Sequence, residues 1–199
     1  MNKKQEQSDQ TKKRVAEAAR ALFVQKGYKA TSIEDIVAAT GGSKGNIYYH
    51  FKSKEGLFLH LMEEWDREWE QCWLQKKRNY RTTVEKMYGL AELLVLEDLN
   101  HPLSKAADEF FNNEEMTTEV KALAGEMMNR HIQFNEQLIQ EGIDGGEFRT
   151  DQASELAIVL EGLFIGLSKM SRVLPPESAI RLYRAAIHTF LNGIVRSSP

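Results

Sequence analysis

The 199-residue chain has little of the residue types that build disulfide-linked or metal-bound small domains. Its one cysteine, Cys72, cannot form a disulfide within the chain, and it excludes a zinc site made of several cysteines. Only 4 prolines and 13 glycines are present, so a loop-rich or collagen-like architecture is not expected. No apolar run approaches the roughly 18 residues that a membrane span needs. Because residues 1–13 also lack a signal-peptide-like apolar stretch, we expect a cytoplasmic protein that contacts no membrane.

Signatures of catalysis are missing as well. The five histidines are scattered without HxxxH or HExxH spacing, and neither a GxGxxG motif nor a Walker phosphate loop occurs. Cys72 stands among Trp and Gln without a neighbour that would activate a thiol. We therefore expect no enzyme, no cofactor and no metal site.

Charge is divided unevenly along the chain. Residues 1–55 contain 11 Lys and Arg against 6 Asp and Glu, a net charge of +5, whereas the remaining 15 against 23 give −8. A basic N-terminal part joined to an acidic body suggests that the basic part binds a polyanion. Chance clustering of solvated charge produces the same division, and charge alone leaves that alternative open.

Helical spacing dominates the chain, and no alternating strand pattern is convincing. A first helix is expected over 10–26, where apolar residues recur on one face, and two short helices follow with a Gly41-Gly42 break between them. Longer helices are expected at about 53–79, 82–99, 102–113, 117–142, 151–173 and 175–196. We predict an all-α chain of about nine helices, with a three-helix helix-turn-helix domain over 1–52 and a larger helical domain over 53–199.

The short helix predicted to begin at Ser43 has the residues of a DNA-reading helix. Such a helix presents its N-terminal residues to base edges in the major groove, and here these are Ser43, Lys44, Gly45 and Asn46. Lys44 can donate to guanine O6 and N7, and Asn46 can pair with adenine. Gly45 costs about 1 kcal/mol relative to Ala inside a helix, and close approach to DNA would explain it.

Further hydrogen-bond donors surround that helix. Hydroxyl, imidazole and ammonium groups suited to phosphate oxygens are carried by Thr31, Ser32, Tyr48, Tyr49, His50 and Lys54. Tyr48 and Tyr49 also fit a place in the core, and we expect one of them to be partly buried. The predicted partner of this segment is double-stranded DNA.

This segment resembles the TetR family of one-component transcriptional regulators. The matching residues are Gly27-Tyr28, Ala30-Thr31, Ile36-Val37, Ser43-Lys44-Gly45, Tyr48, His50-Phe51 and Lys54-Glu55 with Leu57. The resemblance implies an all-α homodimer with an N-terminal DNA-binding domain and a C-terminal domain that binds a small inducer. It also implies that Lys44, Asn46, Tyr48, Tyr49, His50 and Lys54 lie at the DNA. Within the family, residues 43–73 are most similar to multidrug-binding repressors of quaternary-ammonium efflux.

The body contains aromatic residues at helical spacing, with Trp65, Trp69 and Trp73 on one face of a long helix. From periodicity alone such a stripe is more often plain core than a ligand site. The resemblance implies a ligand-stacking position at Trp69, and on that basis we predict an inducer pocket for hydrophobic molecules, cationic ones among them. Its predicted lining is Trp65, Trp69, Asp98, His101 and Phe110.

The last two predicted helices have apolar stripes suited to dimerisation. One stripe runs from Leu156 through Leu160 and Leu167 to Met170, and another runs through the helix at 175–196. Two such helices from each subunit can form a four-helix bundle, although part of each stripe is expected to face its own core. The sequence thus predicts a dimeric repressor that binds a palindromic operator and is released by a small inducer. The alternative is an activating or architectural helix-turn-helix protein without an inducer.

Overall fold

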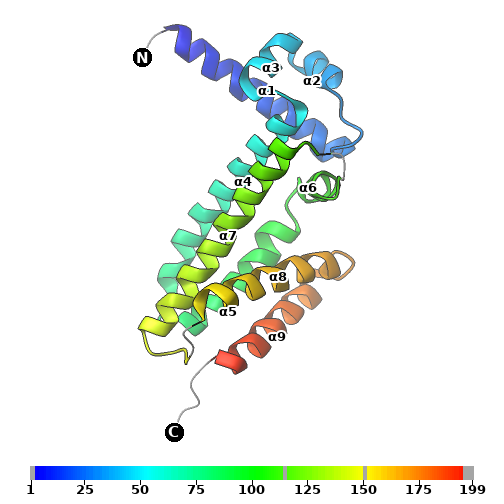
Figure 1. Cartoon of the computed structure of the whole chain (residues 1–199). Helices are drawn as coiled ribbons and strands as arrows, with labels where there is room; N and C mark the ends of the chain where they lie inside the picture. Colours follow the sequence, from blue (N-terminus) through cyan, green and yellow to red (C-terminus); the bar gives the residue numbers. More distant parts are fainter. Residues whose placement is uncertain (1–2, 114–115, 150–151, 195–199) are drawn as a thin grey trace. The chain divides into compact units, whose positions relative to one another are not determined.

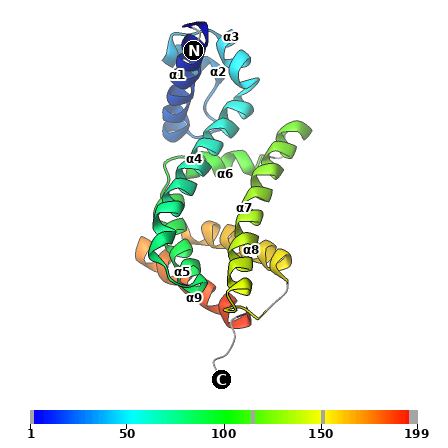
Figure 2. The same cartoon turned by 90° about the vertical axis from the view of Figure 1, so that its left-hand side faces the viewer.

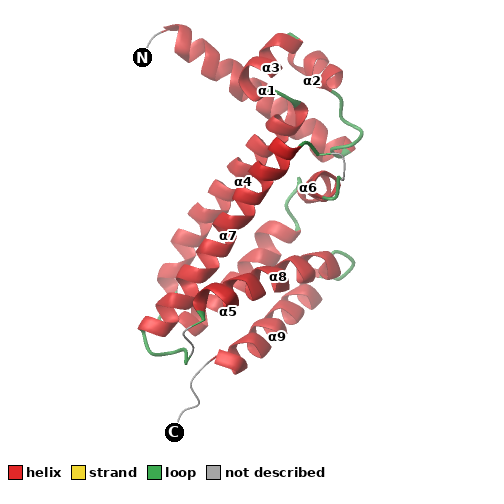
Figure 3. Ribbon diagram, in the orientation of Figure 1, coloured by secondary structure: helices red, strands yellow, loops and turns green. Residues whose placement is uncertain are grey.

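The computed structural model describes residues 3–113, 116–149 and 152–194 (Figure 1). All regular elements in these ranges are helices, and Figure 3 draws no strand among them, which confirms the all-α expectation. The elements are α1 (Lys3–Lys26), α2 (Ile33–Thr40), α3 (Lys44–Phe51), α4 (Lys54–Lys76), η1 (Lys77–Asn79), α5 (Thr83–Leu93), η2 (Leu94–Leu99), α6 (Ser104–Phe111), α7 (Thr118–Asp144), α8 (Ala153–Ser171) and α9 (Pro176–Ile194).

The helices pack as two compact units. Unit 1 comprises Met1–Glu68 and Pro102–Ala124, and unit 2 comprises Trp69–His101 and Gly125–Pro199. Helix α4 contributes residues to both units, and α6 belongs to unit 1 although it follows α5 in the chain. This division by packing differs from the expected boundary between residues 52 and 53, and the boundary therefore stays a prediction.

Unit 1 is held together by an aromatic cluster under α1, α2 and α3. The Phe58 ring lies 5.0 Å from the rings of Phe23 and Tyr28, and the Phe110 ring of α6 lies 4.9 Å from both Tyr28 and Phe58. These four side chains are at most 3 % exposed, so each buries most of its large apolar surface. The cluster fixes the base on which α2 and α3 stand beside α1 (Figures 1 and 2).

Unit 2 has its own core, formed chiefly where α5 and α8 pack against α9. Met87 and Leu90 of α5 and Tyr183 and Ile187 of α9 are at most 2 % exposed. Leu160 of α8 is fully buried in the same core. Spacing of three and four residues on each helix brings these side chains to one face, as the periodicity predicts.

Two helical boundaries differ from those expected. α1 begins at Lys3 rather than near residue 10, because its polar first turns carry no apolar periodicity that would reveal them. The helix expected over 82–99 is α-helical only to Leu93, after which η2 continues as a π-helix. A π-helix inserts a residue into the helical register, and that insertion leaves no mark in the apolar spacing.

Candidate nucleic-acid interface and ligand site

Side-chain caps define the start of each short helix in unit 1. Ser32 caps α2: its hydroxyl oxygen accepts from the Asp35 N–H at 3.1 Å, while the Asp35 carboxylate accepts from the Ser32 N–H at 3.0 Å. Gly41 ends α2 with φ +62°, a left-handed conformation that favours glycine. Ser43 then caps α3 by accepting from the Asn46 N–H at 3.4 Å. The tight turn from Gly41 to Ser43 makes α2 and α3 a helix-turn-helix.

Helix α3 divides into a buried face and an exposed one. Ile47 and Phe51 are at most 5 % exposed and anchor α3 in unit 1, whereas Tyr48 is 49 % and Tyr49 is 72 % exposed. Gly45 at the N-terminal end of α3 is exposed, and a Cβ built there would meet only the Ser43 hydroxyl, at 3.5 Å. The exposed face is thus the one that contains the residues predicted to approach DNA. Both tyrosines lie outside the core, and Tyr48, which is half-buried, is the one that fits the expected partial burial.

Lys44, the first residue of α3, pairs with a carboxylate of α2. Its ammonium donates to Glu34 Oε1, and this contact raises the pKa of Lys44 and lowers that of Glu34. Glu34 lies in the first turn of α2, where the helix dipole favours an anion. Lys44 and Glu34 are ten residues apart and lie on two different helices, so helical periodicity does not predict that they pair.

Three residues predicted to contact phosphate, namely Ser32, Thr31 and Lys54, have their donors engaged inside the protein. The Ser32 hydroxyl donates to Asp35 Oδ2 at 2.9 Å. Thr31 is 1 % exposed, and its hydroxyl donates to the carbonyl of Gly27 at 2.7 Å. Its assignment to phosphate contact is therefore corrected: the hydroxyl closes the loop between α1 and α2. The Lys54 ammonium donates to the carbonyls of Tyr28 and Thr31 at 3.1 and 3.0 Å, so this structure gives it an anchoring role in place of the expected phosphate contact.

His50 lies at the edge of the exposed face. Its ring packs edge-on against the Tyr49 ring, with centroids 4.9 Å apart. Burial, and then the nearby ammonium of Lys12, lower the pKa of His50 below its usual value of 6.5. At neutral pH the imidazole is therefore uncharged and can donate one N–H.

Unit 2 contains an aromatic group around Trp69. The rings of Trp69 and Trp73 are stacked 6.4 Å apart at 9°, and Phe134 of α7 packs edge-on against both at 5.3 and 5.8 Å. Trp73 is 3 % exposed, so it belongs to the core. The indole N–H of Trp69 is buried and has no hydrogen-bond partner among the described residues. A buried donor without an acceptor is costly and suits a site that a polar ligand atom completes.

The residues of the predicted inducer pocket are divided between the two units. Trp69, Asp98 and His101 belong to unit 2, where the His101 N–H donates to the Asp98 carbonyl at 3.0 Å. Burial, and then the charge of Asp98, raise the pKa of Tyr183 to about 12. Trp65, which is half-buried, and Phe110 belong to unit 1.

Phe110 is corrected from a pocket residue to a core residue. It is fully buried beneath Tyr28 and Phe58, in the aromatic cluster that supports α1 to α3. An aromatic residue at helical spacing fits a core ring and a ligand-stacking ring equally, so the sequence does not distinguish the two roles.

The predicted dimerisation stripes are partly core. Leu160 and Leu167 of α8 are at most 8 % exposed, and so are Tyr183 and Ile187 of α9. The exposed apolar residues of α8, which include Met170 of the predicted stripe, lie away from its buried side, on what we call the outer face of α8. It consists of Ile158, Val159, Gly162, Ile165, Gly166 and Met170.

Neither a metal-holding cluster nor a candidate membrane span occurs in the described ranges. No group of three His, Cys, Asp or Glu side chains is close enough there to hold a metal ion. Among the described residues, no helix is apolar over the length required to cross a bilayer.

The geometry of unit 1 defines a helix-turn-helix DNA-binding protein, and comparison with known proteins specifies its class. The model of the tetR family of bacterial regulatory proteins matches residues 15–61, and that of the C-terminal region of QacR-like proteins matches residues 65–196. The chain therefore belongs to the TetR family of transcriptional regulators, which confirms the family expected from residues 27–57 and the expectation that it is not an enzyme.

Individual relatives agree along nearly the whole chain. The HTH-type transcriptional regulator QacR of Staphylococcus aureus strain Mu50 is 28 % identical over 183 residues, which are 92 % of this chain and 97 % of that protein. A regulator from Saccharomonospora viridis, solved in complex with choline, aligns with a TM-score of 0.75 at 23 % identity over 95 % and 100 % of the two chains. NalD, the secondary repressor of the MexAB-OprM multidrug efflux pump in Pseudomonas aeruginosa, aligns with a TM-score of 0.70 at 22 % identity over 97 % and 100 %.

Proposed function

We propose that this protein is a dimeric repressor that reads a palindromic DNA operator through α3 and releases it when a hydrophobic, cationic inducer binds. The observation that carries the proposal is the division of α3, in which Ile47 and Phe51 are buried while Tyr48, Tyr49 and Lys44 face solvent. Tyr49 is 72 % exposed, so the free protein forgoes the stabilisation that burying its ring would give. Contact with DNA would cover this ring.

Within this proposal the residues of α3 have separate roles. Lys44 and Asn46 read base edges at the N-terminal end, and Gly45 between them lets the backbone approach the groove. Ser43, Tyr48, Tyr49 and His50 donate to phosphates on either side.

The outer face of α8 is the proposed dimer contact. Ile158 and Val159 are 58 % and 56 % exposed, and Met170 is 69 % exposed. A Cβ at Gly162 or Gly166 would meet nothing within 4 Å, so a second helix can approach closely there. A two-fold dimer places its two reading helices about 34 Å apart, or a multiple of that, and so reads a palindrome.

The proposed inducer site is centred on Trp69. The aromatic face of Trp69 and its unpartnered N–H suit a flat molecule with an acceptor. Asp98, whose charge acts on Tyr183 in the same unit, is the carboxylate that we assign to a cation. The chemistry agrees with two fold neighbours, one solved with choline and one named as a repressor of a multidrug efflux pump. Because α4 contributes to both units, a ligand that binds one conformer of α4 better than another shifts DNA affinity by that difference.

Selection of bound duplexes from a random pool tests the DNA part of the proposal. We expect a palindrome, and enrichment of no shared sequence would contradict it. Titration of the protein–operator complex with a cationic dye tests the inducer part. Tryptophan quenching together with release of DNA supports it, whereas neither effect at high micromolar dye favours the alternative of a regulator without an inducer.

A further inference from the structure

A carboxylate lies beside the residue to which the proposed function assigns base reading. Glu34 is the second residue of α2, and its Oε1 accepts a hydrogen bond from the ammonium of Lys44 at the start of α3. The two side chains are 65 % and 56 % exposed, so the pair lies on the surface of the helix-turn-helix.

The neighbouring acid shows that Glu34 is not required to cap α2. Asp35 alone completes the capping box with Ser32, and it also pairs with Lys26 at 3.1 Å. The carboxylate of Glu34 instead reaches across the turn to α3. The carboxylate of Glu34 adds a negative charge to a surface that is proposed to meet phosphates, and this charge weakens DNA binding. We therefore look for a role of Glu34 other than stabilising α2.

The pair affects cognate and random DNA differently. An ammonium has three N–H groups, so Lys44 can keep its bond to Glu34 and still donate to guanine O6 and N7. On random DNA, where phosphates supply the attraction, the paired Lys44 adds no net charge and Glu34 is repelled. The pair therefore weakens binding to random DNA more than binding to a site with guanine opposite Lys44.

We propose that Glu34 is a specificity-determining residue, which holds the Lys44 ammonium for a base edge and withholds it from phosphates. The inference rests on the proposed function, because it requires α3 to read DNA. Glu34 acts through Lys44, and it is a positioning residue rather than a base-reading one.

The test uses the full chain with Glu34→Gln, which keeps the shape of the side chain and removes its charge. Affinity is measured for the duplex selected from the random pool and for a random duplex, over a series of salt concentrations. We expect the variant to bind the random duplex several-fold more tightly, with the slope of log affinity against log salt steeper by about 0.9, the value for one added phosphate contact. The ratio of selected to random affinity should fall by the same several-fold factor.

Two controls separate this role from a general charge effect. Glu17→Gln removes an exposed carboxylate of α1 that pairs with Lys13 at 3.9 Å, and it should leave the ratio unchanged. In a Lys44→Ala background, Glu34→Gln should no longer alter the ratio, since the partner is gone. The proposal is overturned if Glu34→Gln leaves the ratio unchanged, or if it changes the ratio equally with and without Lys44. Failure of the proposed function is distinguished by the parent chain, which would then show no preference for the selected duplex.

Discussion

The ammonium of Lys54 lies 4.2 Å from the centre of the Tyr28 ring and donates hydrogen bonds to the main-chain carbonyls of Tyr28 and Thr31. Lys54 is the first residue of α4, so this contact ties the long helix to the loop between α1 and α2. The Tyr28 hydroxyl donates in turn to Glu55 at 3.1 Å. The start of α4 therefore anchors the base of the helix-turn-helix through two consecutive residues.

Replacing Lys54 should lower stability. In Lys54→Gln the shorter side chain loses the cation–π contact and leaves at least one carbonyl unpaired, and we expect the free energy of unfolding to fall by about 1–2 kcal/mol. Urea denaturation measures the change. Lys29→Gln, at an exposed position in the same loop, is the matched control and should unfold like the parent. Equal stability of Lys54→Gln and the parent would contradict the anchoring role.

Gly45→Ala should separate stability from DNA binding. Alanine fits the free protein and favours a helix, so the variant should be more stable by roughly 0.5 kcal/mol. The added methyl group stands where α3 meets the groove, and operator affinity should fall at least tenfold. Gly125→Ala in α7, where a Cβ meets nothing within 4 Å, should stabilise the protein similarly without weakening DNA binding. Undiminished operator affinity of Gly45→Ala would show that the backbone does not approach DNA there.

The cap of α2 should give stability that depends on pH. The N–H of Ser32, then its hydroxyl and Lys26, lower the pKa of Asp35 from 3.8 to about 2. Because the folded-state pKa is the lower one, the ionised carboxylate stabilises the fold above about pH 4, and this contribution disappears as pH falls from 4 to 2. The difference in unfolding free energy between the parent and Asp35→Asn should therefore be constant near neutrality and vanish towards pH 2. A difference that keeps its neutral-pH size down to pH 2 would contradict this account of the cap.

Charge on the outer face of α8 should dissociate the dimer. In Ile158→Glu with Ile165→Glu, two exposed apolar residues become like charges that face each other across the two-fold axis. Sedimentation should show a folded monomer with operator affinity reduced by several orders of magnitude. Val24→Glu on α1, at an apolar position 43 % exposed, should remain dimeric. A double variant that stays dimeric would place the interface elsewhere.

The sequence predicted the fold well because its caps and apolar spacing act locally. Ser43, Gly41 and the periodic residues of α1 determine helix starts, ends and faces within a few residues. The predicted exposure of Lys44 and Gly45 follows from the same local rules. These features do not depend on which distant residue is packed against them.

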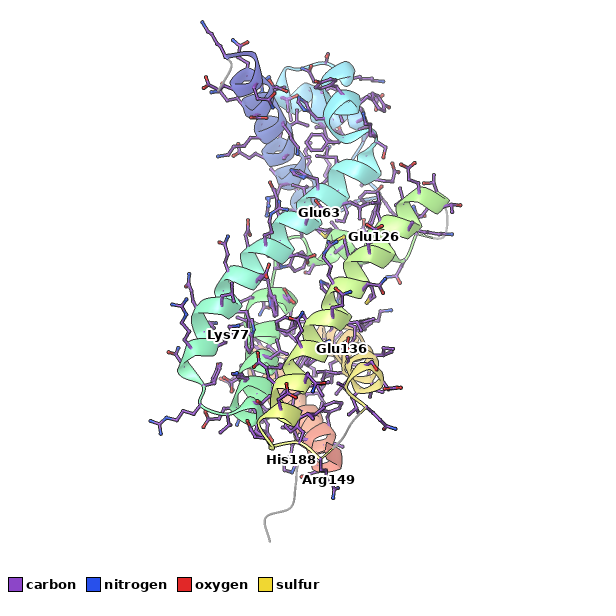
Figure 4. All side chains as sticks on the ribbon, turned by 60° about the vertical axis from the view of Figure 1, so that its left-hand side comes forward. Glu63, Lys77, Glu126, Glu136, Arg149 and His188 are labelled. Carbon is purple, nitrogen blue, oxygen red and sulfur yellow. The ribbon has the colours of Figure 1, made fainter. Side chains whose placement is uncertain are left out.

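The roles that could not be predicted depend on distant partners. A hydroxyl such as that of Thr31 can donate a hydrogen bond to a carbonyl as readily as to a phosphate. Only the folded loop, in which the Gly27 carbonyl lies beside this hydroxyl, shows which acceptor it uses. Glu147 gives a further example in unit 2, since its carboxylate accepts the N–H groups of Thr83 and Val84 at the start of α5, more than 60 residues away. His188 of α9, labelled in Figure 4, is a similar case, because its Nδ1 forms a 3.2 Å hydrogen bond with the Tyr88 hydroxyl of α5. The two residues are 100 positions apart in the chain.

The most direct test of the account is the affinity of a Lys44→Ala, Tyr49→Ala double variant for the duplex selected by the parent. Both side chains are exposed, so thermal unfolding should be unchanged. We expect operator affinity to fall on the order of a hundredfold, since a base contact and a phosphate contact are lost together. Unaltered affinity in a folded dimer would remove the exposed face of α3 from the DNA and contradict the central claim.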